Sequence, residues 1–177
     1  EPMKVITVAQ NKGGTGKTTV ARLLAEYFSQ KGLRVVGIDL DPQCSFSQRF
    51  VAMDSDPTDP DGILPPVHPD YDPTDAGDWN GRSSIADIFF GKEVVPYPTR
   101  LPNLDLLVGN GERLRKVELV TEDQVKDRVH DRLAQFLAIP DVAQNWDLAI
   151  IDTSPSKGPL TVSAIRAATH LLITTIM

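Results

Sequence analysis

Residues 12–19, which read Lys-Gly-Gly-Thr-Gly-Lys-Thr-Thr, restrict the fold of this chain more than any other stretch. An apolar run precedes them at residues 5–9, and a helical pattern begins near Val20. A strand, a glycine-rich turn and a helix in this order form a phosphate cradle, because glycines let backbone N–H groups point at an anion. We expect Lys17 to reach the outer phosphates and Thr18 to ligate Mg²⁺. The predicted phosphate-binding residues are Gly13, Gly14, Thr15, Gly16, Lys17, Thr18 and Thr19.

A second lysine, Lys12, stands before the first glycine of this loop. A plain phosphate loop, Gly-x-x-x-x-Gly-Lys-Ser/Thr, has no lysine there. With it, the loop resembles that of the deviant Walker A ATPases, which include the ParA and MinD proteins. The resemblance implies that Lys12 contacts the nucleotide of a partner subunit across a dimer interface, and so is both nucleotide-binding and catalytic. The alternative is an ordinary solvated loop lysine.

The composition is that of an ordinary globular protein. The chain has 177 residues, of which 41% are apolar, and we expect one domain with its own core. No apolar run approaches the roughly 18–20 residues that a membrane span requires. The single cysteine, Cys44, excludes an internal disulfide and a cysteine-only metal site within one chain. These features favour a cytoplasmic setting.

The acidity of the chain is concentrated in residues 53–81. This segment holds eight Asp, six Pro and no Lys or Arg, so leaving it out moves the formal net charge from −6 to +2. Such a composition cannot sustain a helix or a central strand, and we expect an extended surface loop or insertion. Calcium binding is the alternative, but the prolines and the missing twelfth-position Glu do not fit an EF-hand loop.

The rest of the chain alternates between strand and helix patterns. Strands are expected over residues 4–9, 33–38, 104–108, 148–151 and 171–175, and helices from near Val20, over 83–90, from Thr121 and over 160–168. The first helix presents Val20, Leu23, Leu24, Tyr27 and Phe28 as a buried stripe, and Thr121 with Gln124 forms a capping box. This alternation predicts an α/β fold, a three-layer sandwich around a mostly parallel sheet.

Three aspartates follow apolar strands and should meet at the carboxyl edge of that sheet. Asp152 comes after Leu148–Ile151, the pattern of an acid that holds Mg²⁺, although it could instead cap the next turn. Asp39 and Asp41 end the second strand, where a carboxylate could orient a water against the γ-phosphate. They could also be turn residues before Pro42.

Two of these segments extend the family resemblance. Residues 39–43, Asp-Leu-Asp-Pro-Gln, resemble the switch I motif of ParA proteins, and residues 152–156, Asp-Thr-Ser-Pro-Ser, resemble their Walker B and switch II region. The match implies that Asp41, with Lys12 and Lys17, is catalytic and positions the attacking water. It also implies that Thr18, Asp39 and Asp152 serve the metal. Ser154 departs from the family pattern, which has a proline there, and this bears on the rigidity of the switch.

The resemblance covers residues 4–175 apart from the acidic segment, and it implies a P-loop NTPase of the deviant Walker A type. It implies a weak ATPase that uses ATP/ADP and Mg²⁺ and forms an ATP-dependent homodimer. It further implies nonspecific DNA binding on the nucleoid and stimulation by a ParB-type centromere-binding protein, without a membrane. Because the chain stops at the end of a strand, we expect a C-terminally truncated form of the partition ATPase.

Three other functions fit parts of the sequence. A MinD-like membrane-cycling ATPase requires a basic amphipathic helix at its C-terminus. An iron–sulfur carrier requires cysteines shared across a dimer, and Cys44 stands alone beside residues 39–43. A metabolic ligase of the dethiobiotin-synthetase type has a phosphate loop but no role for Asp41-Pro42-Gln43.

Overall fold

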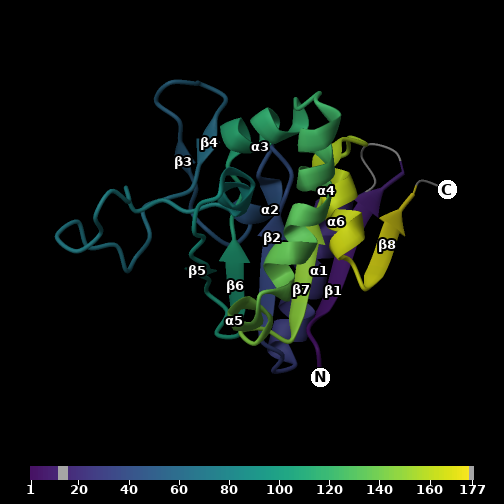
Figure 1. Ribbon diagram of the computed structural model, residues 1–177. Helices are drawn as coiled ribbons and strands as arrows, with labels where there is room; N and C mark the ends of the chain where they lie inside the picture. Colours follow the sequence, from purple (N-terminus) through teal and green to yellow (C-terminus); the bar gives the residue numbers. More distant parts are fainter. Residues whose placement is uncertain (12–15, 176–177) are drawn as a thin grey trace.

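The computed structural model describes residues 1–11 and 16–175. Strands and helices alternate along much of the chain (Figure 1). The strands are β1 (Lys4–Gln10), β2 (Val35–Asp39), β3 (Asp54–Ser55), β4 (Ile63–Leu64), β5 (Tyr97–Pro98), β6 (Leu104–Leu107), β7 (Leu148–Asp152) and β8 (His170–Thr174). The helices are α1 (Lys17–Gln30), α2 (Ser45–Gln48), the 3-10 helix η1 (Ile85–Phe90), α3 (Gly111–Glu118), α4 (Asp123–Ala138), α5 (Pro140–Ala143) and α6 (Pro159–Ala167).

Six of the strands form one sheet in the order β5-β6-β2-β7-β1-β8. All neighbours are parallel except β5 and β6, which are antiparallel. The central strands β2 and β7 are buried at every residue, as expected for parallel strands covered on both faces. The predicted mostly parallel α/β sheet is therefore confirmed.

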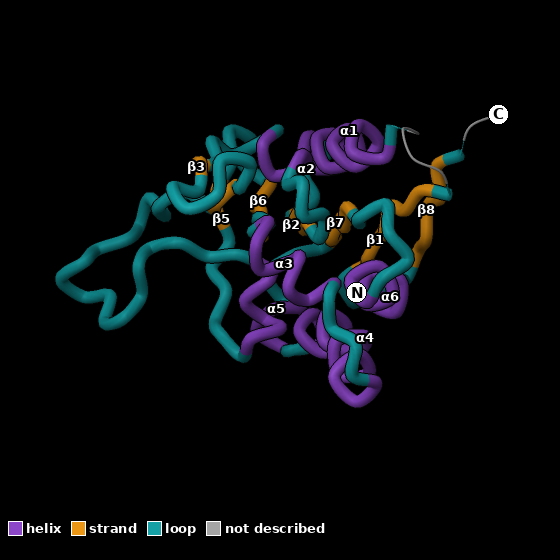
Figure 2. Tube along the Cα trace, turned by 90° about the horizontal axis from the view of Figure 1, so that it is seen from above, coloured by secondary structure: helices purple, strands orange, loops and turns teal. Residues whose placement is uncertain are grey.

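Alternation along each strand divides the core into two apolar clusters. In β2, Val35 belongs to the cluster under α1 and α2, whereas Val36 belongs to the cluster under α3, α4 and α6. In β7, Ile150 and Ile151 divide in the same way, because successive side chains of a strand point to opposite faces. Figure 2 shows the result, with α1 and α2 on one side of the sheet and α3 to α6 on the other.

The first helix differs from its prediction in its start and in its buried face. It begins at Lys17, directly after Gly16, and it buries Ala21 and Ala25 completely. Leu23 and Tyr27, which the apolar stripe included, are 51% and 55% exposed. Val20, Leu24 and Phe28 of the predicted stripe are partly buried and pack against the cluster under α1, while the small residues Ala21 and Ala25 allow the helix to lie close to the sheet.

One further expectation about a helix is wrong, and one helix was not predicted. α4 begins at Asp123 after Glu122, and no side chain caps it, so the capping box at Thr121 does not form. The sequence also gave no indication of α3, because Gly109 and Gly111 resemble a turn. Asn110 does cap α3, since its side chain accepts a hydrogen bond from the Arg113 backbone N–H at 3.2 Å.

The acidic segment, residues 53–81, extends away from the sheet beyond β5, with the short antiparallel pair β3 and β4 at its base (Figure 1). We call it the acidic arm. It contains no helix and no strand of the main sheet, in agreement with the prediction. His68 attaches it to the body: its ring is 4% exposed, lies on Tyr97 and is 2.9 Å from the carbonyl oxygen of Pro96.

Candidate functional site

The sheet brings the predicted aspartates to one edge. Asp39 at the end of β2 pairs in register with Asp152 at the end of β7, and Asp152 also pairs with Val8 of β1. The chain continues across this edge, since the Leu40 backbone N–H donates to the carbonyl oxygen of Asp152 at 2.9 Å. Residues more than a hundred positions apart therefore meet where ligands bind in parallel α/β sheets.

Lys17 is the central side chain of the site. It is the first residue of α1, its side chain is 3% exposed, and it forms a close ion pair with the Asp152 carboxylate. Its Nζ also lies 3.8 Å from Oδ2 of Asp41. The preceding Gly16 has a φ of 77°, a left-handed conformation that glycine adopts without strain. Thus the glycine before α1 allows the turn that directs Lys17 toward both carboxylates.

Thr18 lies beside the same carboxylate. Its hydroxyl donates to Oδ2 of Asp152 at 3.1 Å, so a neutral oxygen and a charged oxygen stand side by side. These are the donors that Mg²⁺ prefers, and Mg²⁺ commonly takes only one or two protein ligands in addition to phosphates and water. Within residues 1–11 and 16–175 no group of three or more His, Cys, Asp or Glu could hold a metal. The pair Thr18 and Asp152 fits a magnesium ion shared with a phosphate.

Asp41 stands at the mouth of the site. Its Oδ1 accepts a hydrogen bond from the Gln43 backbone N–H at 3.0 Å, which folds residues 41–43 into a turn and leaves Oδ2 on the side of Lys17. A cavity of about 210 Å³ lies here, lined by Gln10, Gly16, Lys17, Thr18, Thr19, Asp41 and Pro155. Asp41 therefore faces the same space as the phosphate-loop lysine.

Asp39 has a different environment from Asp41. It is fully buried, its Oδ1 accepts from the Asp41 backbone N–H at 3.0 Å, and its Oδ2 accepts from the backbone and hydroxyl of Ser47 at 2.8 and 2.6 Å. Burial, and then the nearby Asp152 carboxylate, raise the pKa of Asp39 to about 7. These contacts make Asp39 an organiser of residues 39–47. Its contribution to the metal stays a prediction.

Burial also raises the pKa of Asp152, while the ammonium of Lys17 opposes the shift. Desolvation disfavours a carboxylate, and a cation in contact with it favours the charged form. A ligand that draws Lys17 away would therefore have to compensate Asp152 with another cation. A magnesium ion would meet this requirement.

Four predicted residues, Lys12, Gly13, Gly14 and Thr15, lie outside the described residues. The described part of the loop, Gly16 to Thr19, is at the cavity, as are Asp41 and Asp152 through its contacts with Lys17 and Thr18. Sequence reasoning missed Ser47, which no motif marks. Its hydroxyl donates to Asp39 and accepts from the Gly109 backbone N–H at 2.9 Å.

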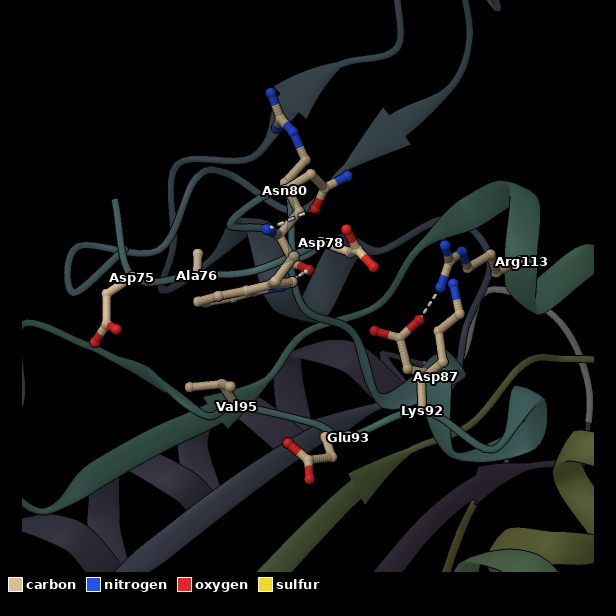
Figure 3. Close-up of a pocket in the computed structure, with 11 residues that line it drawn as sticks. Asp75, Ala76, Asp78, Asn80, Asp87, Lys92, Glu93, Val95 and Arg113 are labelled. Carbon is tan, nitrogen blue, oxygen red and sulfur yellow. Dashed lines mark hydrogen bonds and ion pairs between the residues drawn. The ribbon is translucent and has the colours of Figure 1, made fainter. Parts of the chain in front are cut away.

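A larger cavity, of about 530 Å³, lies under the acidic arm (Figure 3). Its lining includes Trp79 of the arm, Lys92 and Glu93 after η1, and the ion pair of Asp87 with Arg113. None of the described phosphate-loop residues lines it. The described residues of the predicted phosphate loop therefore line the smaller cavity at the edge of the sheet.

A family model described as an AAA domain matches residues 3–177. The chain belongs to this family. Its AAA domain is 36% identical over 180 residues to "Putative replication protein A" of Rhizobium rhizogenes, a match that covers 98% of the chain and 40% of that protein. It is 28% identical over 176 residues to "Chromosome partitioning protein ParA" of Caulobacter vibrioides, with 97% of the chain and 55% of that protein covered.

Solved structures agree on the fold of this AAA domain. A putative plasmid partition protein of Borrelia burgdorferi B31, bound to AMPPNP, superimposes with a TM-score of 0.71 at 23% identity, over 98% of the chain and 63% of that chain. The predicted resemblance to ParA-type partition ATPases and the predicted fold class are confirmed. The chain spans 40% of the length of two curated relatives that are both named "Putative replication protein A". Among the described residues, no helix is long and apolar enough to cross a membrane.

Proposed function

We propose that this AAA domain binds ATP with Mg²⁺, hydrolyses it slowly and acts in the partition of a plasmid or chromosome. The observation that carries the proposal is the position of Lys17, which contacts Asp152 and faces Asp41 at one cavity. A lysine, a metal-binding carboxylate and a second carboxylate at a phosphate loop are the parts that phosphoryl transfer to water requires.

The residues would divide the reaction as follows. Asp41 orients a water for in-line attack on the γ-phosphorus, so that a bond from the water oxygen forms as the bond to the bridging oxygen of ADP breaks. Lys17 leaves its carboxylate partners for the phosphate oxygens and stabilises the charge that develops on them. Thr18 and Asp152 would hold Mg²⁺, which would supply positive charge against the phosphates.

Asp39 would contribute to this site by holding the backbone around Asp41 in place. Its hydrogen bonds to Asp41 and Ser47 fix the turn that carries the Asp41 carboxylate. A reactant held in the right geometry reacts faster because less entropy is lost on the way to the transition state. We infer that Asp39 positions Asp41 and lies next to Asp152, the proposed metal ligand, on the neighbouring strand.

The assembly belongs to the proposal as well. The resemblance to ParA-type proteins supports an ATP-dependent homodimer in which Lys12 reaches the partner's nucleotide, and a ParB-type protein that stimulates turnover on nonspecific DNA. A cation supplied in trans can accelerate phosphoryl transfer by about 10³–10⁵, which is consistent with a slow intrinsic rate.

Static light scattering of the whole protein tests this assembly. With ATP and Mg²⁺ the mass should double, and Lys12→Ala should abolish the doubling, because an uncompensated phosphate charge would remain at the interface. Lys31→Ala, an exposed lysine at the end of α1, is the matched control and should dimerise normally. A wild-type protein that stays monomeric in ATP and Mg²⁺ would refute the proposed dimer.

The rate of ATP hydrolysis, measured with DNA or with liposomes added, distinguishes a partition function from a membrane-cycling function. Nonspecific DNA together with the partner protein should stimulate hydrolysis, whereas anionic liposomes should leave it unchanged. Stimulation by liposomes alone would favour a MinD-like function, and conversion of an organic acid at the expense of ATP would favour a ligase.

A further inference from the structure

Helix α3 lies between the two loops that complete the site. At its start, the Gly109 backbone N–H donates at 2.9 Å to the hydroxyl of Ser47, the residue that holds Asp39. A Cβ placed on Gly111 would lie 2.9 Å from the carbonyl oxygen of Pro42, which is too close for any other residue without movement. The N-terminal end of α3 therefore packs directly on the backbone around Asp41.

The last residue of α3, Glu118, contacts the other loop. Its Oε2 accepts a hydrogen bond from the Ser156 hydroxyl at 2.6 Å, and its Oε1 accepts one from the Leu160 backbone N–H at 2.9 Å. Leu160 lies in the first turn of α6, where backbone N–H groups have no partner within the helix. The N-cap residue of α6, Gly158, supplies no side chain, so a carboxylate from another helix caps α6.

Gly158 allows the Glu118 carboxylate to lie close to the start of α6. A Cβ at this position would collide with the Glu118 carboxylate, although the φ of −77° would suit any residue. Glycine at 158 thus leaves room for the Glu118 carboxylate, which would have to move aside for any other residue. The carbonyl oxygen of Ser156 is also held, because it accepts from the Thr161 hydroxyl at 2.8 Å.

The loop of residues 153–158, which Glu118 contacts, borders the cavity that Lys17 and Asp41 line. Pro155, the neighbour of Ser156, lines the cavity of Lys17 and Asp41, and Asp152 begins the loop. Position 154 holds a serine, which leaves φ free where a proline would fix it. Contacts from outside the loop have to limit its conformations instead.

We infer that Glu118 is a positioning residue for ATP hydrolysis. It holds residues 153–158 against α3, whose other end holds the Asp41 loop, so that one short helix sets the distance between the two loops. This role rests on the proposed function. Glu118 contacts neither ATP nor metal in it, and acts only through Ser156 and the start of α6.

The kinetic test compares Glu118→Ala with Glu118→Gln. Alanine should lower kcat about fivefold and leave KM within about twofold, because the loop then samples more conformations without losing a phosphate contact. Glutamine should restore most of kcat, since its amide oxygen can accept from Leu160 and its amide N–H can donate to the Ser156 hydroxyl. Glu112→Ala removes a carboxylate from the same helix, one that forms an ion pair with Lys116 at 3.0 Å, and should leave kcat and KM unchanged.

Amide hydrogen exchange of residues 154–160 supplies a readout that needs no ATP. Exchange should quicken in Glu118→Ala, in Ser156→Ala and in Gly158→Ala, whose new methyl group displaces the carboxylate. If wild-type protein failed to hydrolyse ATP, the proposed function would be refuted. Hydrogen exchange would still show whether Glu118 holds Ser156 and the start of α6 in place. Unchanged exchange in Ser156→Ala and Gly158→Ala would overturn the inference, as would a kcat for Glu118→Ala within twofold of wild type.

Discussion

At the residue scale, the environment of Asp39 has the clearest energetic consequence. Its carboxylate is buried beside Asp152 and receives hydrogen bonds from Ser47 and Asp41. The hydrogen bonds favour the charged form, but burial and the neighbouring charge outweigh them and raise its pKa to about 7. Folding therefore retains a proton on Asp39 over a pH range in which the unfolded chain has lost it.

This difference predicts how stability changes with pH. Below the unfolded pKa both states hold the proton, and as pH rises from about 4 to about 7 only the unfolded state releases it, so stability falls. The penalty is at most about 4 kcal/mol and is constant above that range. Asp39→Asn should flatten this part of the profile, while the exposed Asp127→Asn should keep it. Urea unfolding at several pH values measures both, and parallel profiles for wild type and Asp39→Asn would contradict the assignment.

At the element scale, the strands could be predicted better than the helices. Continuous apolar runs such as residues 148–151 identify buried parallel strands, and an Asp at the end of each run identifies the functional edge. The face of α1 could be predicted only in part: Val20, Leu24 and Phe28 pack against the core, but Ala21 and Ala25, which are buried completely, carry little apolar signal. α3 was missed because Gly111 at its start packs closely against Pro42, and Gly109 before it packs against Cys44, a reason that only the tertiary structure reveals.

The packing of α4 on the sheet gives a stability prediction at this scale. Leu133 of α4 is fully buried in the cluster under α3, α4 and α6. Leu133→Ala should lower the free energy of unfolding by about 2–5 kcal/mol, through lost burial and the cavity left behind. Leu119→Ala, at a side chain 76% exposed, should cost far less. Denaturant unfolding of both variants measures the difference, and equal losses would show that α4 does not seal this cluster.

At the scale of the whole molecule, the chain is a sheet whose carboxyl edge holds the candidate site. The acidic arm extends away from the sheet beyond β5 (Figure 1). The sequence predicted an extended surface loop with no helix and no central strand, but it indicated neither the β3–β4 pair nor the attachment of the arm. His68 is a buried residue in a mostly exposed polar segment, and its contacts with Pro96 and Tyr97 join positions about thirty apart. No local pattern reports such contacts.

Removing that attachment should release the arm and leave the sheet intact. His68→Ala deletes the ring on Tyr97 and the contacts to Pro96 and the Asp70 backbone N–H. Cleavage by a protease specific for aspartate should then accelerate roughly tenfold within residues 70–78, since proteolysis follows local opening. His130→Ala, on α4, should not change the rate. An arm cleaved equally fast in wild type and His68→Ala would show that the attachment lies elsewhere.

The convergence of Lys17, Thr18, Asp41 and Asp152 could be predicted from the sequence, since parallel strands place their carboxyl ends together. The supports of that site could not. Ser47, Gly109 and Glu118 act through contacts between residues 38 to 62 positions apart, and each residue type is ordinary where it stands. The chemistry of the site is thus carried by motifs, and its rigidity by packing.

The central claim is that Lys17 binds phosphate and Asp41 positions the attacking water. A single-turnover assay with radiolabelled ATP on the whole protein tests it most directly, with binding and phosphate release followed in the same sample. Asp41→Ala should bind ATP within about threefold of wild type yet release phosphate at least about a hundredfold more slowly, whereas Lys17→Ala should lose binding itself. Phosphate release by Asp41→Ala at the wild-type rate would contradict the account.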